Sequence, residues 1–127
     1  MKISEFAKVT NVSVETVRYY HRERLLSVPS NKTGIRQYLS SHIGQMNFIN
    51  NAKLAGFSLA EIKQLSAYDS VTDRQSILKL SEQKKKNLKQ KIKELKGAMT
   101  FLQSLVSECR SSKENQCPIL ERLKGVS

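Results

Sequence analysis

The apolar residues between Leu88 and Cys109 recur at alternating gaps of four and three residues. They are Leu88, Ile92, Leu95, Met99, Leu102, Val106 and Cys109. This spacing forms a heptad seam, which is the pattern of a helix that packs along one stripe against another helix. The period weakens upstream, because Ser81 and Lys84 do not fit it.

The helix that carries this seam is predicted to be long. Thr72 and Gln75 have the spacing of a capping box, so we expect the helix to start near Asp73. From Asp73 to Cys109 it would measure roughly 55 Å at about 1.5 Å per residue. A domain of this size cannot cover such a stripe internally, and a second copy of the chain is the simplest partner. We therefore assign residues 71–109 to a dimerisation helix.

The first 38 residues predict two short helices joined by a tight turn. The first covers residues 4–9, with Ile3, Phe6, Ala7 and Val9 on its apolar face. Ser13 is a favoured N-cap for a second helix that begins at Val14 and turns Val17 and Tyr20 inward. Because the outer face of this second helix is polar and basic, the pair has the pattern of a helix-turn-helix.

Two further helices are expected before residue 70. Residues 25–38 predict a hairpin around a turn-rich segment, and such a hairpin after a helix-turn-helix is a wing. Ser40 is expected to cap a third helix, which ends at Gly56. Ser58 and Glu61 form a capping box for a short fourth helix through Leu65.

The last 18 residues, 110–127, predict a loop followed by a short helix. Residues 110–116 are polar and lack periodicity. Pro118 suits the first position of a helix, which places Cys117 at the N-cap and Gly125 at the end.

The charge balance indicates a polyanionic partner. The net charge is +11, of which residues 1–70 contribute +4 and residues 71–127 contribute +7. Much of the second excess comes from seven lysines: Lys84, Lys85, Lys86, Lys89, Lys91, Lys93 and Lys96. Two interpretations stay open for them: a solvated helix face, or a surface that adds non-specific attraction to DNA.

Several short motifs occur in the order found in one known family. They are Val12-Ser-Val-Glu-Thr-Val-Arg-Tyr-Tyr20, Leu25-Leu26, Gly34-Ile-Arg-Gln-Tyr38, Phe48-Ile49 and Ala55-Gly-Phe-Ser-Leu-Ala-Glu-Ile62. With these motifs residues 1–68 resemble the MerR family of bacterial transcription regulators. The long helix and the segment Cys117-Pro-Ile-Leu120 extend the resemblance over nearly the whole chain.

The resemblance implies a mainly α fold with a winged helix-turn-helix head, including a small β wing, at residues 1–70. The long helices of two chains would form an antiparallel coiled coil. Such a homodimer would bind a pseudo-palindrome in promoter DNA, meet RNA polymerase there, and distort the DNA when an effector binds. The DNA contacts implied for this chain are Ser13, Val14, Glu15, Thr16, Arg18, Tyr19, Tyr20, Lys32, Arg36 and Tyr38, with Tyr20 alternatively a core residue.

The chain departs from the family pattern at two positions. Arg24 stands where the family usually has glycine, and a left-handed backbone at a non-glycine residue costs about 1 kcal/mol. Ile35 stands where the wing commonly has tyrosine, which removes one expected phosphate contact.

Cys109 and Cys117 enclose a loop at the end of the long helix. Cys117 at a helix N-terminus would have a lowered pKa, because the unpaired N–H groups stabilise a thiolate. Two thiolates suit a soft ion such as Cu(I), Ag(I), Hg(II) or Zn(II). The alternative is that both cysteines are small apolar packing residues. The resemblance favours the metal, because metal-sensing members carry a pair of loop cysteines here.

The resemblance also bears on which ion would bind. In that subfamily a residue near the start of the partner's long helix separates sensors of divalent ions from sensors of monovalent ions. The matching position is Arg74, with Ser76 nearby, and the chain has no third cysteine. We therefore expect Cu(I) or Ag(I) rather than a divalent site of three or four ligands. Arg74 could offset the negative charge of a bis-thiolate complex, or could mean that the site no longer binds metal.

Other functions find less support in the sequence. An enzyme is not expected, since there is no Ser/His/Asp arrangement and no phosphate-binding glycine loop. His21 and His42 lie in the head and are expected to be structural rather than metal ligands. A redox or electrophile sensor that uses the same two cysteines, and a DNA binder with inert cysteines, remain alternatives. No apolar run could span a bilayer, so we expect a cytoplasmic protein without a membrane partner.

Overall fold

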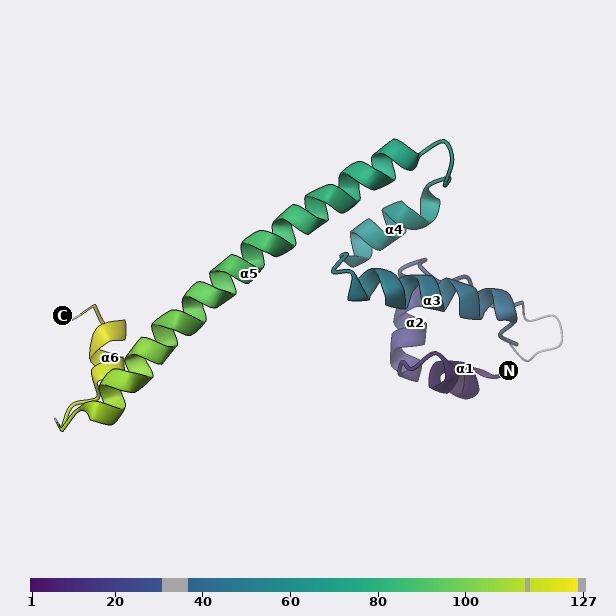
Figure 1. Cartoon of the computed structure of the whole chain (residues 1–127). Helices are drawn as coiled ribbons and strands as arrows, with labels where there is room; N and C mark the ends of the chain where they lie inside the picture. The colour runs from purple at the N-terminus through teal and green to yellow at the C-terminus, as the bar shows by residue number, and fades with distance from the viewer. Residues whose placement is uncertain (31–36, 114, 126–127) are drawn as a thin grey trace. The chain divides into compact units, whose positions relative to one another are not determined.

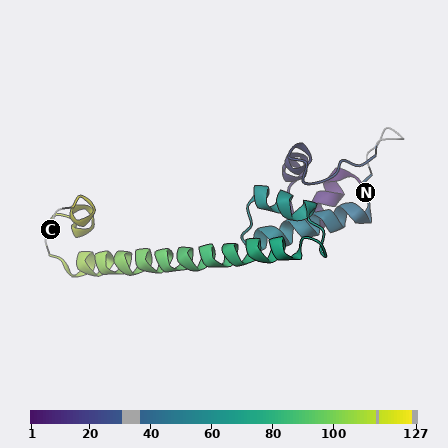
Figure 2. The same cartoon turned by 90° about the horizontal axis from the view of Figure 1, so that it is seen from above.

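The computed structural model describes residues 1–30, 37–113 and 115–125, which together form six helices. No strand occurs in these ranges. Residues 31–36 of the expected wing, which include Lys32 and Arg36, lie outside them. The chain divides into two compact units, Met1–Ser81 and Glu82–Ser127. Figures 1 and 2 show the six helices from two directions.

The first two helices form the predicted helix-turn-helix. Helix α1 (Ile3–Val9) and helix α2 (Val14–Arg22) are joined by a turn in which Asn11 has a φ of 60°. The Ser13 side chain accepts a hydrogen bond from the Thr16 N–H at 3.0 Å, so the predicted N-cap is confirmed. Val9 was expected on the buried face but is 57% exposed, which corrects that prediction.

Helix α3 (Ser40–Leu54) begins at Ser40, the residue that was expected to be its N-cap. Leu39, rather than Ser40, is the N-cap residue, and its N–H donates to Nδ1 of His42 at 3.0 Å. Burial first, and then the neighbouring His21, hold the pKa of His42 below its usual value, which favours the neutral ring as the acceptor of this bond. His42 is therefore a structural residue of the head, as expected.

Helix α4 (Leu59–Ala67) starts at the predicted capping box. The Ser58 side chain accepts from the Glu61 N–H, and Glu61 accepts from the Ser58 N–H at 2.8 Å. Gly56, with a φ of 90°, makes the turn out of α3 as expected of a helix-ending glycine.

One hydrophobic core holds the head together. It comprises Phe6, Ala7, Val17, Tyr20, Leu26, Tyr38, Met46, Ile49, Ala52 and Ile62. Phe6 and Tyr38 stack with ring centroids 4.3 Å apart, which joins α1 to the segment before α3. These residues come from α1 to α4 and, for Leu26 and Tyr38, from the segment between α2 and α3. The core thereby fixes the outer face of α2 relative to the rest of the head.

Helix α5 (Arg74–Ser111) carries the heptad seam. The helix begins at Arg74, next to the expected start near Asp73. The expected capping box is not formed as predicted, because the Thr72 hydroxyl donates to Oδ1 of Asp69 at 3.0 Å, in the turn before the helix. The apolar seam residues Leu88, Ile92, Leu95, Met99, Leu102 and Val106 are 38–65% exposed within the chain. The second unit ends with helix α6 (Pro118–Leu123), which lies beside the end of α5 in both views (Figures 1 and 2).

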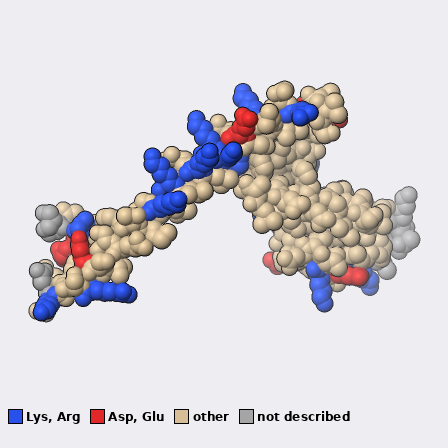
Figure 3. All heavy atoms as spheres, viewed as in Figure 1, with Lys and Arg blue, Asp and Glu red and all other residues tan. Residues whose placement is uncertain are grey.

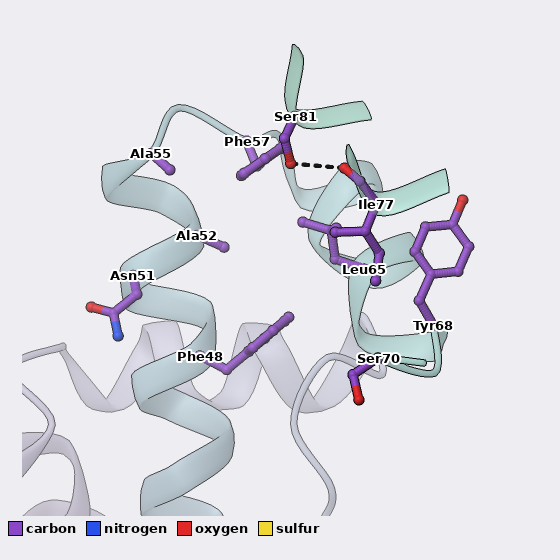
Figure 4. A pocket seen from close by; sticks show the side chains of 10 residues that line it. All are labelled: Phe48, Asn51, Ala52, Ala55, Phe57, Leu65, Tyr68, Ser70, Ile77 and Ser81. Atoms are coloured by element: carbon purple, nitrogen blue, oxygen red, sulfur yellow. Dashed lines mark hydrogen bonds between the residues drawn. The ribbon is translucent and has the colours of Figure 1, made fainter. Parts of the chain in front are cut away.

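The first unit also contains an apolar hollow of about 480 Å³. One side is lined by α3 and its C-cap residue, through Phe48, Asn51, Ala52 and Ala55 (Figure 4). The rest is lined by Phe57, Leu65, Tyr68, Ser70, Ile77 and Ser81. The Ser81 hydroxyl turns back to the Ile77 carbonyl at 2.8 Å, so little of the lining is polar. Sequence reasoning did not predict this hollow.

Candidate DNA-binding face and thiol pair

Most of the residues expected to contact DNA lie on the outer face of α2. Glu15, Arg18 and Tyr19 are exposed, as is the cap residue Ser13. Val14 and Thr16 are half-buried at the edge of that face. The helix thus presents a contiguous surface, held in place by Val17 and Tyr20 in the core.

Two expected DNA contacts are buried instead. Tyr20 is 2% exposed and Tyr38 is 3% exposed, so both are core residues in this structure. For Tyr20 this is the alternative that the sequence left open, whereas for Tyr38 burial does not fit the predicted DNA contact. The Tyr38 hydroxyl lies 2.8 Å from Nε2 of His21, whose Nδ1 lies 3.1 Å from the Leu26 carbonyl oxygen. His21 is therefore a structural residue too, as expected.

Two basic residues beside this surface, Arg22 of α2 and Lys53 of α3, were not among the predicted DNA contacts. The guanidinium of Arg22 lies 5.7 Å from the centre of the Tyr19 ring. Lys53 of α3 donates through Nζ to the Tyr20 hydroxyl at 3.2 Å. Arg22 could have been found from its place one turn after Arg18, whereas Lys53 comes close to α2 only through the tertiary fold.

Basic side chains also gather along α5 (Figure 3). All of the lysines from Lys85 to Lys96 are exposed, and Lys84 is half-buried. The acidic residues of this part of the helix are Glu82 and Glu94, so the positive charge is not balanced locally.

Cys109 and Cys117 lie close together at the end of α5. Their thiols are within hydrogen-bonding reach of each other, and both residues are half-buried. They belong to different elements, since Cys109 is in the last turns of α5 and Cys117 is the N-cap residue of α6.

The two thiols differ in acidity. The backbone N–H groups of Leu120 and Ile119 face the sulfur of Cys117 and lower its pKa, although the side chain makes no regular cap hydrogen bond. The hydrogen bond from Cys109 lowers this pKa further, while partial burial and the charge of Glu121 oppose the shift. The pKa of Cys109 is raised by burial first and then by the charge of Cys117 and their hydrogen bond.

The surroundings of the thiol pair fix α6 on the end of α5. Leu105, one turn before Cys109, is completely buried, and it is the one buried residue in the described part of α5. Arg122 of α6 donates to Oε1 of Glu108 at 2.7 Å. Both groups of this ion pair are largely exposed, so we expect it to contribute little free energy but to favour this orientation of α6.

The donor set at this end of the chain is small. No cluster of three His, Cys, Asp or Glu side chains suited to a metal ion occurs among the described residues. Arg74 and Ser76, the other expected effector-site residues, are exposed positions in the first turn of α5 and belong to the first unit. Within the chain, the structure therefore brings together two sulfur donors, which fit a soft ion that accepts two-coordination.

The architecture and the sequence were compared with known proteins. The family described as MerR HTH family regulatory protein matches residues 1–69, and one described as MerR, DNA binding, matches residues 43–105. The chain belongs to the MerR family. The predicted resemblance and the mainly helical fold with a helix-turn-helix head and a long C-terminal helix are confirmed.

Its relatives include a regulator named for mercuric resistance and regulators solved with a bound soft metal ion. The mercuric resistance operon regulatory protein of Shigella flexneri is 36% identical over 127 residues, covering 98% of this chain and 88% of that protein. The regulator PbrR691 from Ralstonia metallidurans CH34, solved in complex with lead(II), is 27% identical with a TM-score of 0.76, covering 97% of this chain and 98% of its own. MerR from Bacillus megaterium MB1, solved in complex with mercury(II), is 27% identical with a TM-score of 0.71, covering 98% and 99%.

These relatives are transcription regulators rather than enzymes. In the part of the chain that the structure describes, no helix is both long enough and apolar enough to cross a membrane.

Proposed function

We propose that this chain is a homodimeric transcription regulator that binds promoter DNA and responds to a soft metal ion held by Cys109 and Cys117. The observation that carries the metal half is the meeting of these two thiols, one of them with a lowered pKa. The family membership supports the DNA half. As a regulator acting on bacterial promoter DNA, it would work in the cytoplasm and beside RNA polymerase.

The DNA-binding face would be the exposed side of α2. Arg18 would contact phosphate, and Ser13, Glu15 and Tyr19 would lie against the groove edge. Val14 and Thr16 complete this surface. Lys32 and Arg36, expected in the wing, keep their proposed phosphate contacts, although both lie outside the described residues.

The seam of α5 would be covered by a second copy of the chain. Six of its apolar side chains are 38–65% exposed within one chain, and exposing such a stripe to water is unfavourable. An antiparallel pairing would place the end of one α5 opposite the start of the other. Arg74 and Ser76 of one chain would then lie near the thiol pair of its partner.

Cys109 and Cys117 would hold the ion through their sulfur atoms, and the ion would act as a soft Lewis acid that joins α5 to α6. With two sulfur donors in reach, Cu(I) or Ag(I) fits better than ions that need three or four ligands. A monovalent ion on two thiolates leaves one negative charge, which a nearby Arg74 would offset. Because relatives are named for mercury and lead, Hg(II) and Pb(II) are the competitors to exclude.

An anaerobic titration of the reduced full chain with Cu(I), Ag(I), Hg(II), Pb(II) and Zn(II) tests the metal half. We expect about one Cu(I) or Ag(I) per chain under chelator competition, and loss of that site in Cys109→Ser and in Cys117→Ser. Tighter binding of Hg(II) would keep the sensor but change its effector. If the serine variants retain the wild-type affinity, the two cysteines are not the site.

The DNA half has a separate test. Full-length protein should enrich particular duplexes from a random-sequence pool, and the metal should change the DNA conformation in the complex more than the affinity. Failure to enrich any duplex would contradict the proposal that the chain is a sequence-specific regulator.

The same thiol contact supports a second candidate, a redox sensor. A hydroperoxide would take two electrons and two protons from the pair, leaving a Cys109–Cys117 disulfide, an alcohol and water. Metal-free protein treated with peroxide would then change its regulation of a reporter gene. If replacing both cysteines by serine leaves regulation unchanged under metal and under peroxide, the chain is a DNA binder with inert cysteines.

A further inference from the structure

A second hollow lies directly beside α2. It has a volume of about 420 Å³ and is lined by Thr16, Tyr19, Tyr20, Lys53, Phe57, Ser58 and Leu59. Thr16 and Tyr19 belong to the surface proposed to face DNA, so the hollow continues that surface toward the start of α4. The residues that line it include one cation and no carboxylate.

The cation in this hollow is held in place. Nζ of Lys53 donates to the Tyr20 hydroxyl at 3.2 Å and lies 5.9 Å from the centre of the Tyr20 ring. The ring itself is fixed, because Tyr20 is 2% exposed in the core. A lysine side chain normally loses considerable rotamer freedom when its ammonium binds an anion, and here much of that loss is already incurred on folding.

The acidic residue Glu61 follows Ser58, one of the lining residues, by three positions. Glu61 accepts a hydrogen bond from the Ser58 N–H at 2.8 Å in the capping box of α4. The negative charge of Glu61 lowers the positive electrostatic potential near Ser58. Among the described residues, Lys53 forms no ion pair with Glu61. The ammonium therefore keeps two of its three N–H donors for another partner.

We propose that Lys53, positioned by the Tyr20 hydroxyl, binds a phosphate of the DNA backbone in this hollow, next to the groove that α2 enters. The proposal rests on the proposed DNA-binding function and adds to it a contact made by α3. It assigns to Tyr20 a positioning role from within the core in place of the direct DNA contact that the sequence predicted. Such a contact is independent of base sequence and fixes how α2 sits on the duplex.

The test measures DNA affinity against salt concentration, by fluorescence anisotropy, on a duplex that the wild-type full chain has selected from a random pool. For Lys53→Gln we expect an affinity loss of about tenfold near ~0.1 M salt. The slope of log K against log salt should fall by about one unit, as loss of one phosphate contact requires. Lys63→Gln, an exposed lysine of α4 that does not line the hollow, makes the same charge change and should leave the slope unaltered.

Each other result overturns the proposal. If Lys53→Gln and Lys63→Gln have equal slopes, Lys53 contributes only general positive charge. If Lys53→Gln loses affinity with an unchanged slope, Lys53 acts through packing and not on phosphate. Circular dichroism verifies that each variant is folded. If the wild type selects no duplex, the proposed function fails instead, and that failure is seen before any variant is made.

The positioning role of Tyr20 has its own readout. Tyr20→Phe keeps the buried ring and removes the hydroxyl, so the ammonium stays but is less well placed. We expect a several-fold lower affinity with a full wild-type salt slope, and little further loss when Lys53→Gln is added. Lys53→Arg should retain the slope. Additive losses in the double variant would contradict the coupling between Tyr20 and Lys53.

Discussion

Single backbone positions in the head differ in how well their side chains suit them. Arg24 has a φ of 59° and Asn11 a φ of 60°. Both are left-handed, which asparagine adopts at little cost and arginine does not. The turn at Arg24 is still closed, since the Leu25 N–H donates to the Tyr20 carbonyl oxygen at 2.9 Å. The departure from glycine that the sequence showed at Arg24 is therefore a site of local strain.

Replacing Arg24 by glycine should raise the free energy of unfolding. We expect a gain of about 0.5–1 kcal/mol, because relief of the left-handed strain exceeds the extra entropy of glycine in the unfolded chain. Urea unfolding at a fixed protein concentration measures it. Asn11→Gly is the control and should change stability by much less. A loss of stability in Arg24→Gly would mean that the arginine side chain makes a compensating contact.

The two thiols should differ in reactivity. Cys117, whose pKa is lowered by the α6 N–H groups, should be alkylated by iodoacetamide before Cys109 at neutral pH. The alkylation rate of Cys117 should fall as the pH drops through its lowered pKa. Cys109, whose pKa is raised, should need a higher pH than Cys117 to reach the same alkylation rate. Peptide mass spectrometry of the metal-free reduced protein separates the two rates.

Glu121→Gln provides a matched check on this assignment. The charge of Glu121 raises the pKa of Cys117, so its removal should speed alkylation of Cys117. Slower alkylation in that variant, or earlier alkylation of Cys109 in the wild type, would contradict the assignment.

Among the elements, the end of α5 depends on α6. The described part of the second unit contains one completely buried side chain, Leu105, while the seam residues nearby are exposed. Helix α6 is the other helix of that unit and lies beside the end of α5 (Figures 1 and 2). We therefore expect the burial of Leu105, oriented by the Arg122–Glu108 ion pair, to keep α6 and its N-cap residue Cys117 at the end of α5.

Leu105→Ala should release α6 without touching either thiol. Replacing a buried leucine by alanine costs about 2–5 kcal/mol of stability. A helix of six residues has too few other contacts to compensate for that loss. We expect faster hydrogen exchange of the α6 amides and weaker metal binding. Leu102→Ala, whose side chain is 55% exposed in the single chain, should leave α6 exchange unchanged. Equal effects of the two variants would mean that α6 does not depend on Leu105.

For the whole molecule, the exposed seam decides the assembly. Leu95 is 65% exposed and Met99 57% exposed within one chain, in the middle of a 38-residue helix. A stripe of this length is stable in water only when another helix covers it. The proposed homodimer supplies that helix.

Leu95→Asp should therefore convert the dimer to a monomer, because it would bury a carboxylate in the seam. Sedimentation equilibrium measures the mass. Thr100→Asp, an exposed position off the seam, adds the same charge and should remain dimeric. A wild-type protein that sediments as a monomer would contradict the dimer proposal, and a dimeric Leu95→Asp would place the interface elsewhere.

The sequence by itself determined the features that depend on near neighbours along the chain. Capping by Ser13 and Ser58, the end of α3 at Gly56 and the period of the α5 seam all follow from spacings of a few residues. Cys117 at the start of α6 was predictable for the same reason, since Pro118 marks the first turn. Periodicity also separated most of the buried face of α2 from its exposed face.

Only the tertiary structure decided whether the side chains at the edges of those helix faces are buried or exposed. The sequence left Tyr20 open between DNA and the core and predicted Tyr38 as a DNA contact, but both side chains are buried in the core with Phe6 and residues of α3. Lys53 reaches the Tyr20 hydroxyl across 33 residues of sequence. Helical spacing states which way a side chain points, but not which distant residue lies there. Burial of a side chain at the boundary of a face depends on that distant residue.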